Sequence, residues 1–163
     1  MTKAKPDFLG ILSVLAAHEV DFIVVGGVSA VLQGAPIATF DLDIVHSRGP
    51  ANIERLVSAL HELGAYYRGQ GERRIEPTLS HLASPGHQLL LTRLGPLDLL
   101  GTIGKGRSYE RLIQAAEIMA VGSLRVQVLG LSALIESKEE AGRDKDKAML
   151  SILRRTLEER QKK

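Results

Sequence analysis

The sequence predicts an α/β (α+β) fold, and three features carry this prediction. Apolar, β-branched runs at residues 21–25 and 40–46 alternate with segments whose apolar residues recur at helical spacing. Two further β-like runs, at 88–93 and 97–103, are joined by Leu-Gly-Pro, which is typical of an antiparallel hairpin. The chain beyond residue 130 reads as helical. We therefore expect a mixed β-sheet flanked by helices, with a C-terminal helical appendage.

Helix start and stop signals order the first half of the chain. Pro6-Asp7 is a plausible helix start, Gly26-Gly27 ends a strand sharply, and Gly34 and Gly64 stand where helices end. The expected elements are a helix to about residue 19, the strand at 21–25, a short helix at about 29–33, the strand at 40–46 and a helix at 53–63.

The second half has a weaker pattern at its start. Residues 66–85 are interrupted by Gly and Pro and read as short edge strands and loop. The following expected elements are the hairpin, a helix from Ser108 to about 116, a strand pair at 117–121 and 124–128, and helices with a break at Gly142. We divide the chain into a domain at 1–130 and a helical extension, packed on it, at 131–163.

Composition excludes several kinds of site. The 163 residues include no Cys, so disulfides, thiolate metal sites and cysteine nucleophiles are ruled out. Aromatic residues make up 4% and Trp is absent, which argues against base stacking as the main mode of binding. The apolar N-terminal stretch is too short and too polar for a signal or a membrane span. We therefore expect a soluble protein, and the absence of Cys fits a cytoplasmic one.

Three carboxylates in apolar strands indicate a cation site. Asp41 and Asp43 share one face of the strand at 40–46, and residues two apart on a strand lie about 6.5 Å apart. Asp98 stands alone in the run at 97–103, where burial without a partner is costly. Without a cation, repulsion between the paired acids raises one pKa. Oxygen ligands without nearby His or Cys suit Mg²⁺ or Mn²⁺. The alternative is exposed acids on half-exposed strands.

Gly26 and Gly27 stand between a buried strand and a short helix, just before the paired acids. Glycine permits close backbone approach and positive φ, and the N–H groups at a helix start attract phosphate. We expect Gly26, Gly27 and Ser29 to contact phosphates. The alternative is an ordinary strand-to-helix turn, because a double glycine alone is a weak signal.

The Gly-Gly turn, the Asp41-Leu42-Asp43 run and the later lone Asp98 together resemble the nucleotidyltransferase fold of the DNA polymerase beta superfamily. The resemblance covers about residues 20–103. It implies that the three acids hold two divalent ions and that the glycine turn holds the phosphates of a nucleoside triphosphate. Thr39 matches the Thr that precedes the first acid. Many relatives carry an Arg two residues before that Thr, where this chain has Ile37.

The C-terminal segment resembles the last helices of small bacterial members of that superfamily, a branch that includes abortive-infection toxins. The resemblance places Lys138 at triphosphate oxygens. It gives Arg143, Lys145 and Asp146 a role in orienting ligand or in holding the helices together. The alternative for these residues is a solvated helix face.

Other signals are weaker. Gly101 to Ser108 lacks the Walker spacing and reads as a flexible basic loop. The His residues lack metal-ligand spacing, and a structural role is expected for His46. Asp144 and Asp146 point in different directions on a helix. The basic residues from Arg154 onward interleave with Glu, which is typical of a solvated helix, with RNA contact as the alternative.

The function hypothesis is a Mg²⁺-dependent transferase that moves a nucleoside monophosphate from an NTP to an acceptor hydroxyl and releases pyrophosphate. Asp41 and Asp43 would bridge two ions, and Asp98 would hold the ion at the acceptor oxygen and take its proton. The acceptor is a tRNA, a protein or a small molecule such as an antibiotic. A catalytically inactive nucleotide- or partner-binding protein, as half of a toxin–antitoxin pair, is the second hypothesis. A non-catalytic adaptor is the third.

Overall fold

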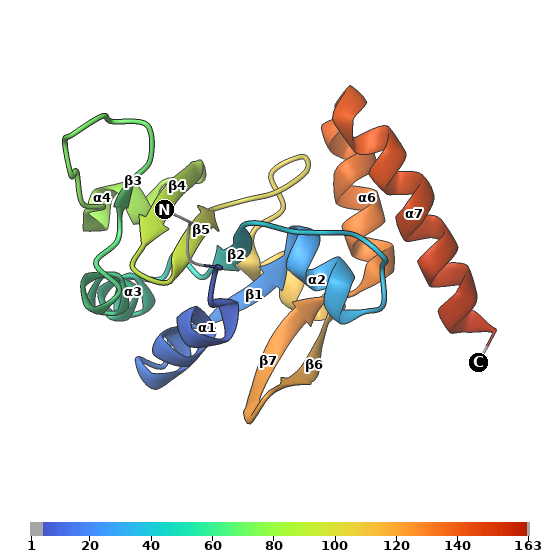
Figure 1. The fold of residues 1–163 in the computed structure, drawn as a ribbon, viewed down its shortest axis with the longest axis horizontal. Coiled ribbons are helices and arrows are strands. Elements are labelled where there is room, and N and C mark those ends of the chain that lie inside the picture. The colour runs from blue at the N-terminus through green and yellow to red at the C-terminus, as the bar shows by residue number, and fades with distance from the viewer. Residues whose placement is uncertain (1–4, 163) are drawn as a thin grey trace.

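The computed structural model describes residues 5–162, apart from the side chain of Lys145. Within this range the strands form one sheet in the order β3-β4-β5-β2-β1-β7-β6 (Figure 1). The strands are β1 (Phe22–Val25), β2 (Leu42–His46), β3 (Tyr66–Tyr67), β4 (His87–Thr92), β5 (Gly95–Leu100), β6 (Ala116–Val121) and β7 (Leu124–Leu129). The helices are α1 (Phe8–Ala17), α2 (Gly26–Leu32), α3 (Pro50–Glu62), α4 (Leu79–Ala83), α5 (Tyr109–Leu112), α6 (Leu131–Ala141) and α7 (Asp144–Gln161), with a 3-10 turn, η1 (Ile113–Ala115), after α5.

The sheet is mixed, as predicted. β2 pairs antiparallel with β1 but parallel with β5, and β1 pairs parallel with β7. The hairpins β4–β5 and β6–β7 match the two strand pairs expected from the sequence. α3, α4 and β3 lie at one end of the molecule, and α6 and α7 run beside each other at the other end (Figure 1).

Alternating side chains along the central strands build two cores, one on each face of the sheet. Val24, Ile44 and Leu99 are buried in one core, together with residues of α1 and α3. Ile23 and Val45 are buried in the other, together with residues of α6 and α7. By this alternation Asp43 and Asp98 fall on the second face. The acids therefore lie on the side of the sheet that α6 covers in part.

Several element boundaries differ from those expected. α2 begins at Gly26 and not near Ser29, because the backbone turns into the helix directly after β1, with Gly26 at φ +65°. β2 begins at Leu42 and not at Phe40, so Asp41 precedes the strand. α4 forms within the stretch expected to be strands and loop, where Thr78 and His81 cap it through reciprocal hydrogen bonds.

The loop between β5 and α5 is tied down, contrary to the flexible basic loop expected from the sequence. Ile103 and Arg107 exchange two backbone hydrogen bonds, of 3.0 and 2.8 Å. The Arg107 side chain forms ion pairs with Glu136, at 3.0 Å, and with Glu140, both on α6. The loop is thereby anchored to α6.

The C-terminal helices follow the sequence prediction. Gly142, at φ +61°, ends α6 in the left-handed conformation, which glycine adopts readily. On α7, Arg154 pairs with Glu139 at 3.0 Å and Arg155 with Glu159 at 3.5 Å, as expected for a solvated helix. No helix within residues 5–162 has the length and apolar character needed to cross a membrane.

Candidate active site

Asp43 and Asp98 lie side by side because their strands are parallel neighbours. The β2–β5 register pairs Asp43 directly with Asp98, and apolar residues surround them in both strands. Asp98 is buried at 8% exposure. The sequence predicted Asp41 and Asp43 in one strand and a lone Asp98 in another, and the strand order supplies the register that brings Asp43 and Asp98 together.

The acid pair is electrostatically strained. Burial, followed by the neighbouring charge of Asp98, raises the pKa of Asp43 to about 7. Burial also raises the pKa of Asp98, and the Arg68 guanidinium opposes that rise. Nη2 of Arg68 lies 2.8 Å from Oδ1 of Asp98. The Asp98 carboxylate therefore has the Arg68 guanidinium as its partner, while burial and neighbouring charge hold the pKa of Asp43 close to neutral.

Asp41 lies outside this pair in the structure. It precedes β2, and its charge raises the pKa of both Asp43 and Asp98. Within residues 5–162, no group of three or more His, Cys or acidic side chains is arranged to hold a metal ion. The Thr39 hydroxyl donates to the backbone carbonyl of Asp41 at 3.2 Å and so fixes the approach to β2. The structure therefore brings two of the three predicted acids into direct neighbourhood, with the third close by.

The glycine turn packs tightly against the acids. A Cβ at Gly26 would overlap the carboxylate of Asp43, and a Cβ at Gly27 would lie 2.6 Å from the Thr39 hydroxyl oxygen. No side chain caps the start of α2, which leaves its first N–H groups free of a side-chain acceptor. Both glycines are thus required by close approach, and Gly26 also by its positive φ.

The Ser29 side chain does not face the site. Its hydroxyl is completely buried and donates to the carbonyl of Leu129 at 2.8 Å. The Gln33 amide also donates to that hydroxyl at 3.0 Å. The expectation that the Ser29 hydroxyl contacts phosphate is therefore corrected: the side chain joins α2 to β7.

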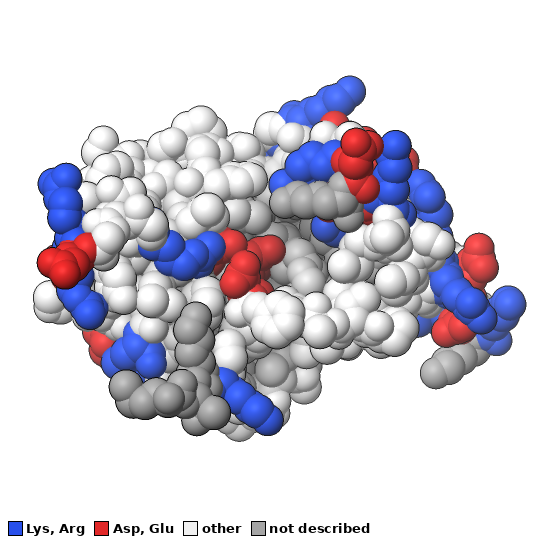
Figure 2. All heavy atoms as spheres, turned by 45° about the horizontal axis from the view of Figure 1, so that its top comes forward, with Lys and Arg blue, Asp and Glu red and all other residues white. Residues whose placement is uncertain are grey.

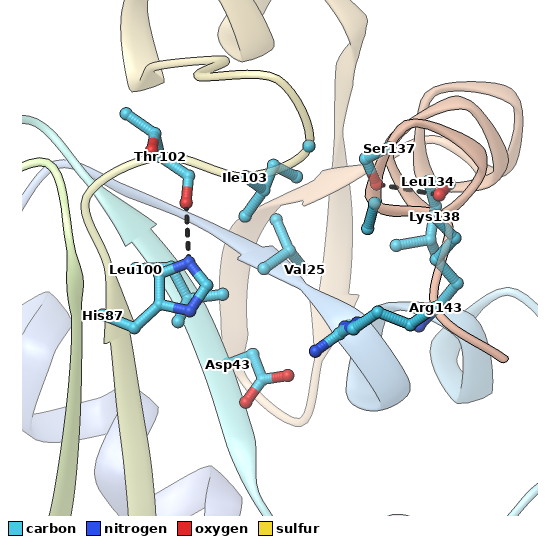
Figure 3. Close-up of a pocket in the computed structure, with 13 residues that line it drawn as sticks. Val25, Asp43, His87, Leu100, Thr102, Ile103, Leu134, Ser137, Lys138 and Arg143 are labelled. Atoms are coloured by element: carbon cyan, nitrogen blue, oxygen red, sulfur yellow. Dashed lines mark hydrogen bonds between the residues drawn. The ribbon is translucent and has the colours of Figure 1, made fainter. Parts of the chain in front are cut away.

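A cavity of about 290 Å³ opens beside the acid pair. Its residues come from β1, the start of α2, β2, β4, the end of β5 and the loop after it, and α6 and the turn after it (Figure 3). Gly26, Asp43, Lys138 and Arg143, which the sequence proposed as site residues, all line it, while Asp98 does not. Figure 3 shows Arg143 extending toward Asp43 from one side, with His87 and Thr102 on the other.

A buried carboxylate positions the two cations of the cavity. Asp146, at 5% exposure, lies 3.3 Å from the Lys138 ammonium and 2.9 Å from Nε of Arg143. Burial raises the pKa of Asp146, but Arg143 and Lys138 together lower it by more, so the net effect is a lowered pKa. The charge of Lys138 also lowers the pKa of Asp43, so the ammonium acts on the acid pair. Asp146 thus holds α6 and α7 together, as the resemblance implied, while the side chain of Lys145 lies outside the described residues.

Two residues of the site had no recognisable signal in the sequence. Arg68 lies in the stretch of poor pattern, and nothing there indicates that it reaches Asp98. His87 was set aside with the other His residues because its spacing does not match a metal site. His46, by contrast, is completely buried and bonds the carbonyl of Leu82 at 2.8 Å, so its predicted structural role is confirmed.

Acidic and basic side chains form separate groups on the face shown in Figure 2. Figure 2 shows acidic side chains gathered in the middle of one face, at the edge of a hollow, with basic side chains on both sides. Ile37, where many relatives have Arg, packs partly buried against the core that includes α6 and α7. Arg68 and Lys138 provide positive charge near the acids instead.

In metal-free buffer the protein is expected to lose stability as the pH rises toward 8. The pKa of Asp43 rises from 3.8 to about 7 on folding, so between these two values the folded state binds more protons than the unfolded state. The free energy of unfolding therefore falls as the pH rises through this range. The expected loss is on the order of 2 to 4 kcal/mol, or roughly 5 to 10 °C in melting temperature.

Thermal unfolding of the wild type and Asp43→Asn with EDTA, from pH 5 to 8, tests this expectation. Asparagine takes up no proton, so the variant should be the more stable protein at pH 8, and the difference should shrink toward pH 5. Burial lowers the pKa of His46, which acts in the opposite direction below about 6.5, but both proteins contain it and the difference cancels it. Melting temperatures of the two proteins that change in parallel with pH would contradict the raised pKa of Asp43.

Comparison with known proteins places this geometry in a known fold. No family model and no curated protein sequence matches the chain. The chain is similar to the structure of a putative nucleotidyltransferase from Thermotoga maritima, with a TM-score of 0.56 and 17% identity over 93% of this chain and 90% of that one. It is also similar to the lincosamide antibiotic adenylyltransferase LnuA with lincomycin bound, with a TM-score of 0.59 and 13% identity over 90% of this chain and 93% of that one. The chain therefore has the nucleotidyltransferase fold, as the motifs predicted.

Proposed function

We propose that this protein is a nucleotidyltransferase that moves a nucleoside monophosphate from an NTP to an acceptor hydroxyl and releases pyrophosphate. The observation that carries the proposal is the in-register pair of the half-buried Asp43 and the buried Asp98, beside a cavity with Gly26, Lys138 and Arg143 in its wall. The fold shared with known nucleotidyltransferases supports it.

Asp43 and Asp98 fit a hard divalent cation as a pair. Oδ1 of Asp98 is buried with the Arg68 guanidinium 2.8 Å away, outside good hydrogen-bond alignment. The pKa of Asp43 is raised by burial and by its acidic neighbours. Such oxygen ligands suit Mg²⁺ or Mn²⁺. Bound there, divalent ions would polarise the phosphoryl group and lower the pKa of the acceptor hydroxyl. Asp41 would complete the set, because its charge already acts on both members of the pair.

Lys138 and Arg143 would hold the triphosphate. Both line the cavity wall facing Asp43, and the buried Asp146 keeps them there at 3.3 and 2.9 Å. The backbone at Gly26 and Gly27 would approach the phosphates at the start of α2, where no side-chain acceptor caps the helix. Cations and backbone N–H groups would together stabilise charge on the departing pyrophosphate.

A small-molecule hydroxyl is one candidate acceptor. LnuA is named for adenylyl transfer to lincosamide antibiotics, and its structure covers almost the whole chain. A tRNA or a protein remains the alternative that the sequence resemblance implied. The cavity, at about 290 Å³, lies at the small end of the range for ligand sites, so an acceptor would occupy its mouth.

A catalytically inactive nucleotide- or partner-binding protein is the second candidate, and one observation favours it. Arg68 forms an ion pair with the carboxylate of Asp98 at 2.8 Å, and a catalytic cation would need that same carboxylate. Such a protein, as part of a toxin–antitoxin pair or alone, would bind NTP without turnover.

Titration with each of the four NTPs and Mg²⁺, followed by a pyrophosphate assay, separates the two candidates. Calorimetry reports binding, and the assay is run with total tRNA, total cellular protein, lincomycin and water as acceptors. Release of pyrophosphate that depends on Mg²⁺ supports the transferase. Tight binding without release across these acceptors supports the inactive nucleotide-binding protein. Absence of NTP binding contradicts the transferase and the nucleotide-binding form of the second candidate.

A further inference from the structure

The cavity has a polar wall that the proposed phosphate contacts do not use. Opposite Lys138 and Arg143 this wall contains His87 and Thr102 (Figure 3). We propose that His87 is the residue that takes the proton from the acceptor hydroxyl, with Nδ1 as the accepting atom. This inference rests on the proposed transferase function and adds a catalytic residue to it.

A backbone carbonyl fixes the protonation pattern of the His87 ring. Nε2 of His87 lies 3.0 Å from the carbonyl oxygen of Thr102, which can only accept a hydrogen bond. Nε2 therefore carries the hydrogen, and in the neutral ring Nδ1 carries the free lone pair. No hydrogen bond within residues 5–162 involves Nδ1 of His87, whereas Nδ1 of His81 bonds the Thr78 backbone and hydroxyl.

The Thr102 carbonyl is held in place by a tight crossing of the chain. The N–H of Gly101 donates to Gly86 at 3.0 Å, and the Thr102 hydroxyl donates to Pro85 at 3.0 Å. A Cβ at Gly101 would overlap the backbone of Ser84 and Pro85, so only glycine permits this approach. Since His87 follows these residues directly, the same contacts fix both ends of its hydrogen bond.

The strand register places His87 on the acid face of the sheet. Leu89 pairs with Asp98, and His87, two residues earlier on β4, shares that face with it. His87 pairs with Leu100, which also lines the cavity. The imidazole thus lies beyond the acid pair, on the side away from the cations that would hold the triphosphate.

His87 suits proton transfer better than the acids do. Asp98 is engaged by Arg68 at 2.8 Å, and the acid pair would be neutralised by the ions it binds. A neutral imidazole with one fixed N–H keeps an unbonded lone pair on its other ring nitrogen, which can accept a proton.

The proposed step balances without a further reactant. The acceptor oxygen forms a bond to the α-phosphorus of the NTP, and the bond from that phosphorus to the α–β bridging oxygen breaks. Pyrophosphate leaves with the electron pair of that bond. The hydroxyl proton passes to Nδ1 of His87, and the imidazolium then releases it to solvent.

Comparison of His87→Gln with His61→Gln tests the proposal. Glutamine can place an amide near the position of Nε2 and keep the bond to Thr102, but it offers no base at Nδ1. We expect kcat for pyrophosphate release to fall by about 10²- to 10⁴-fold, with the Kd for the NTP unchanged within about twofold. The assay uses the NTP and acceptor, among tRNA, cellular protein, lincomycin and water, that serve the wild type best. His61 is exposed on α3, and its variant should keep wild-type kcat.

Nitrogen-15 NMR of the histidine rings gives a second readout that needs no turnover. The wild type should show His87 as the Nε2–H tautomer, with an unprotonated Nδ1. A wild type that releases pyrophosphate, with His87→Gln equally fast or with His87 as the Nδ1–H tautomer, overturns this inference alone. A wild type that binds NTP but releases no pyrophosphate with any of these acceptors overturns the transferase function, and this inference with it.

Discussion

Replacing Asp43 by Asn is expected to lower the rate of nucleoside monophosphate transfer by about 1000-fold or more. Charge stabilisation by bound cations in phosphoryl transfer is worth several kcal/mol. Asp43 is the member of the acid pair that also lines the cavity. Asp98→Asn should cause a loss of similar size. Single-turnover transfer from an α-labelled NTP measures both rates.

Asp144→Asn is the matched control for these variants. Asp144 is an acid on α7 whose side chain is 95% exposed, paired with Lys147 at the surface, and its replacement should leave transfer unchanged. Asp41→Asn adds information, because a loss as large as that of Asp43→Asn would show that Asp41 joins the pair when ions bind. Transfer at the wild-type rate by Asp43→Asn would exclude the acid pair from catalysis.

Replacing Gly26 by Ala is expected to impair both folding stability and transfer. Alanine at φ +65° costs about 1 to 2 kcal/mol, and its Cβ would also collide with the carboxylate of Asp43. Relief of that collision moves either α2 or Asp43. We expect a total loss of about 2 to 4 kcal/mol and a fall in transfer of roughly 100-fold, as the cost of displacing an electrostatic group.

Gly34→Ala separates the cost of backbone strain from the cost of the steric clash with Asp43. Gly34 follows the same helix, has φ +101°, and has no atom within 4 Å of the position its Cβ would take. The Gly34 variant should therefore lose stability through backbone strain while its transfer rate stays within about twofold, since it touches no site residue. Urea unfolding and transfer assays on the two variants make the comparison. Equal transfer rates for the two would contradict the close packing of Gly26 on Asp43.

The fold was predictable because its periodic signals are strong. The apolar run of β1, the hairpins and the stop at Gly142 all follow from local preferences of the chain. The start of β2 was misplaced because Thr39 bonds the backbone of Asp41 and the preceding residues stay irregular. α4 was missed because its cap pairs Thr78 with His81, a variant of the usual Ser/Thr and Glu/Gln box.

The site was predictable only where a residue conflicts with its local surroundings. An acid in an apolar strand, such as Asp98, is conspicuous in the sequence, whereas Arg68 in an irregular stretch is not. Ser29 was misassigned because its partner, the carbonyl of Leu129, lies 100 residues away in the chain. The importance of Asp146 depends on two cations that only the packing of α6 and α7 brings together.

A crystal structure with Mn²⁺ and a non-hydrolysable NTP analogue tests the central claim most directly. The anomalous signal of Mn²⁺ should lie between the carboxylates of Asp43 and Asp98, with Asp41 drawn toward it. The triphosphate should lie between the start of α2 and the Lys138–Arg143 wall. Mn²⁺ absent from the acid pair, or a triphosphate bound outside the cavity, would contradict the proposed active site.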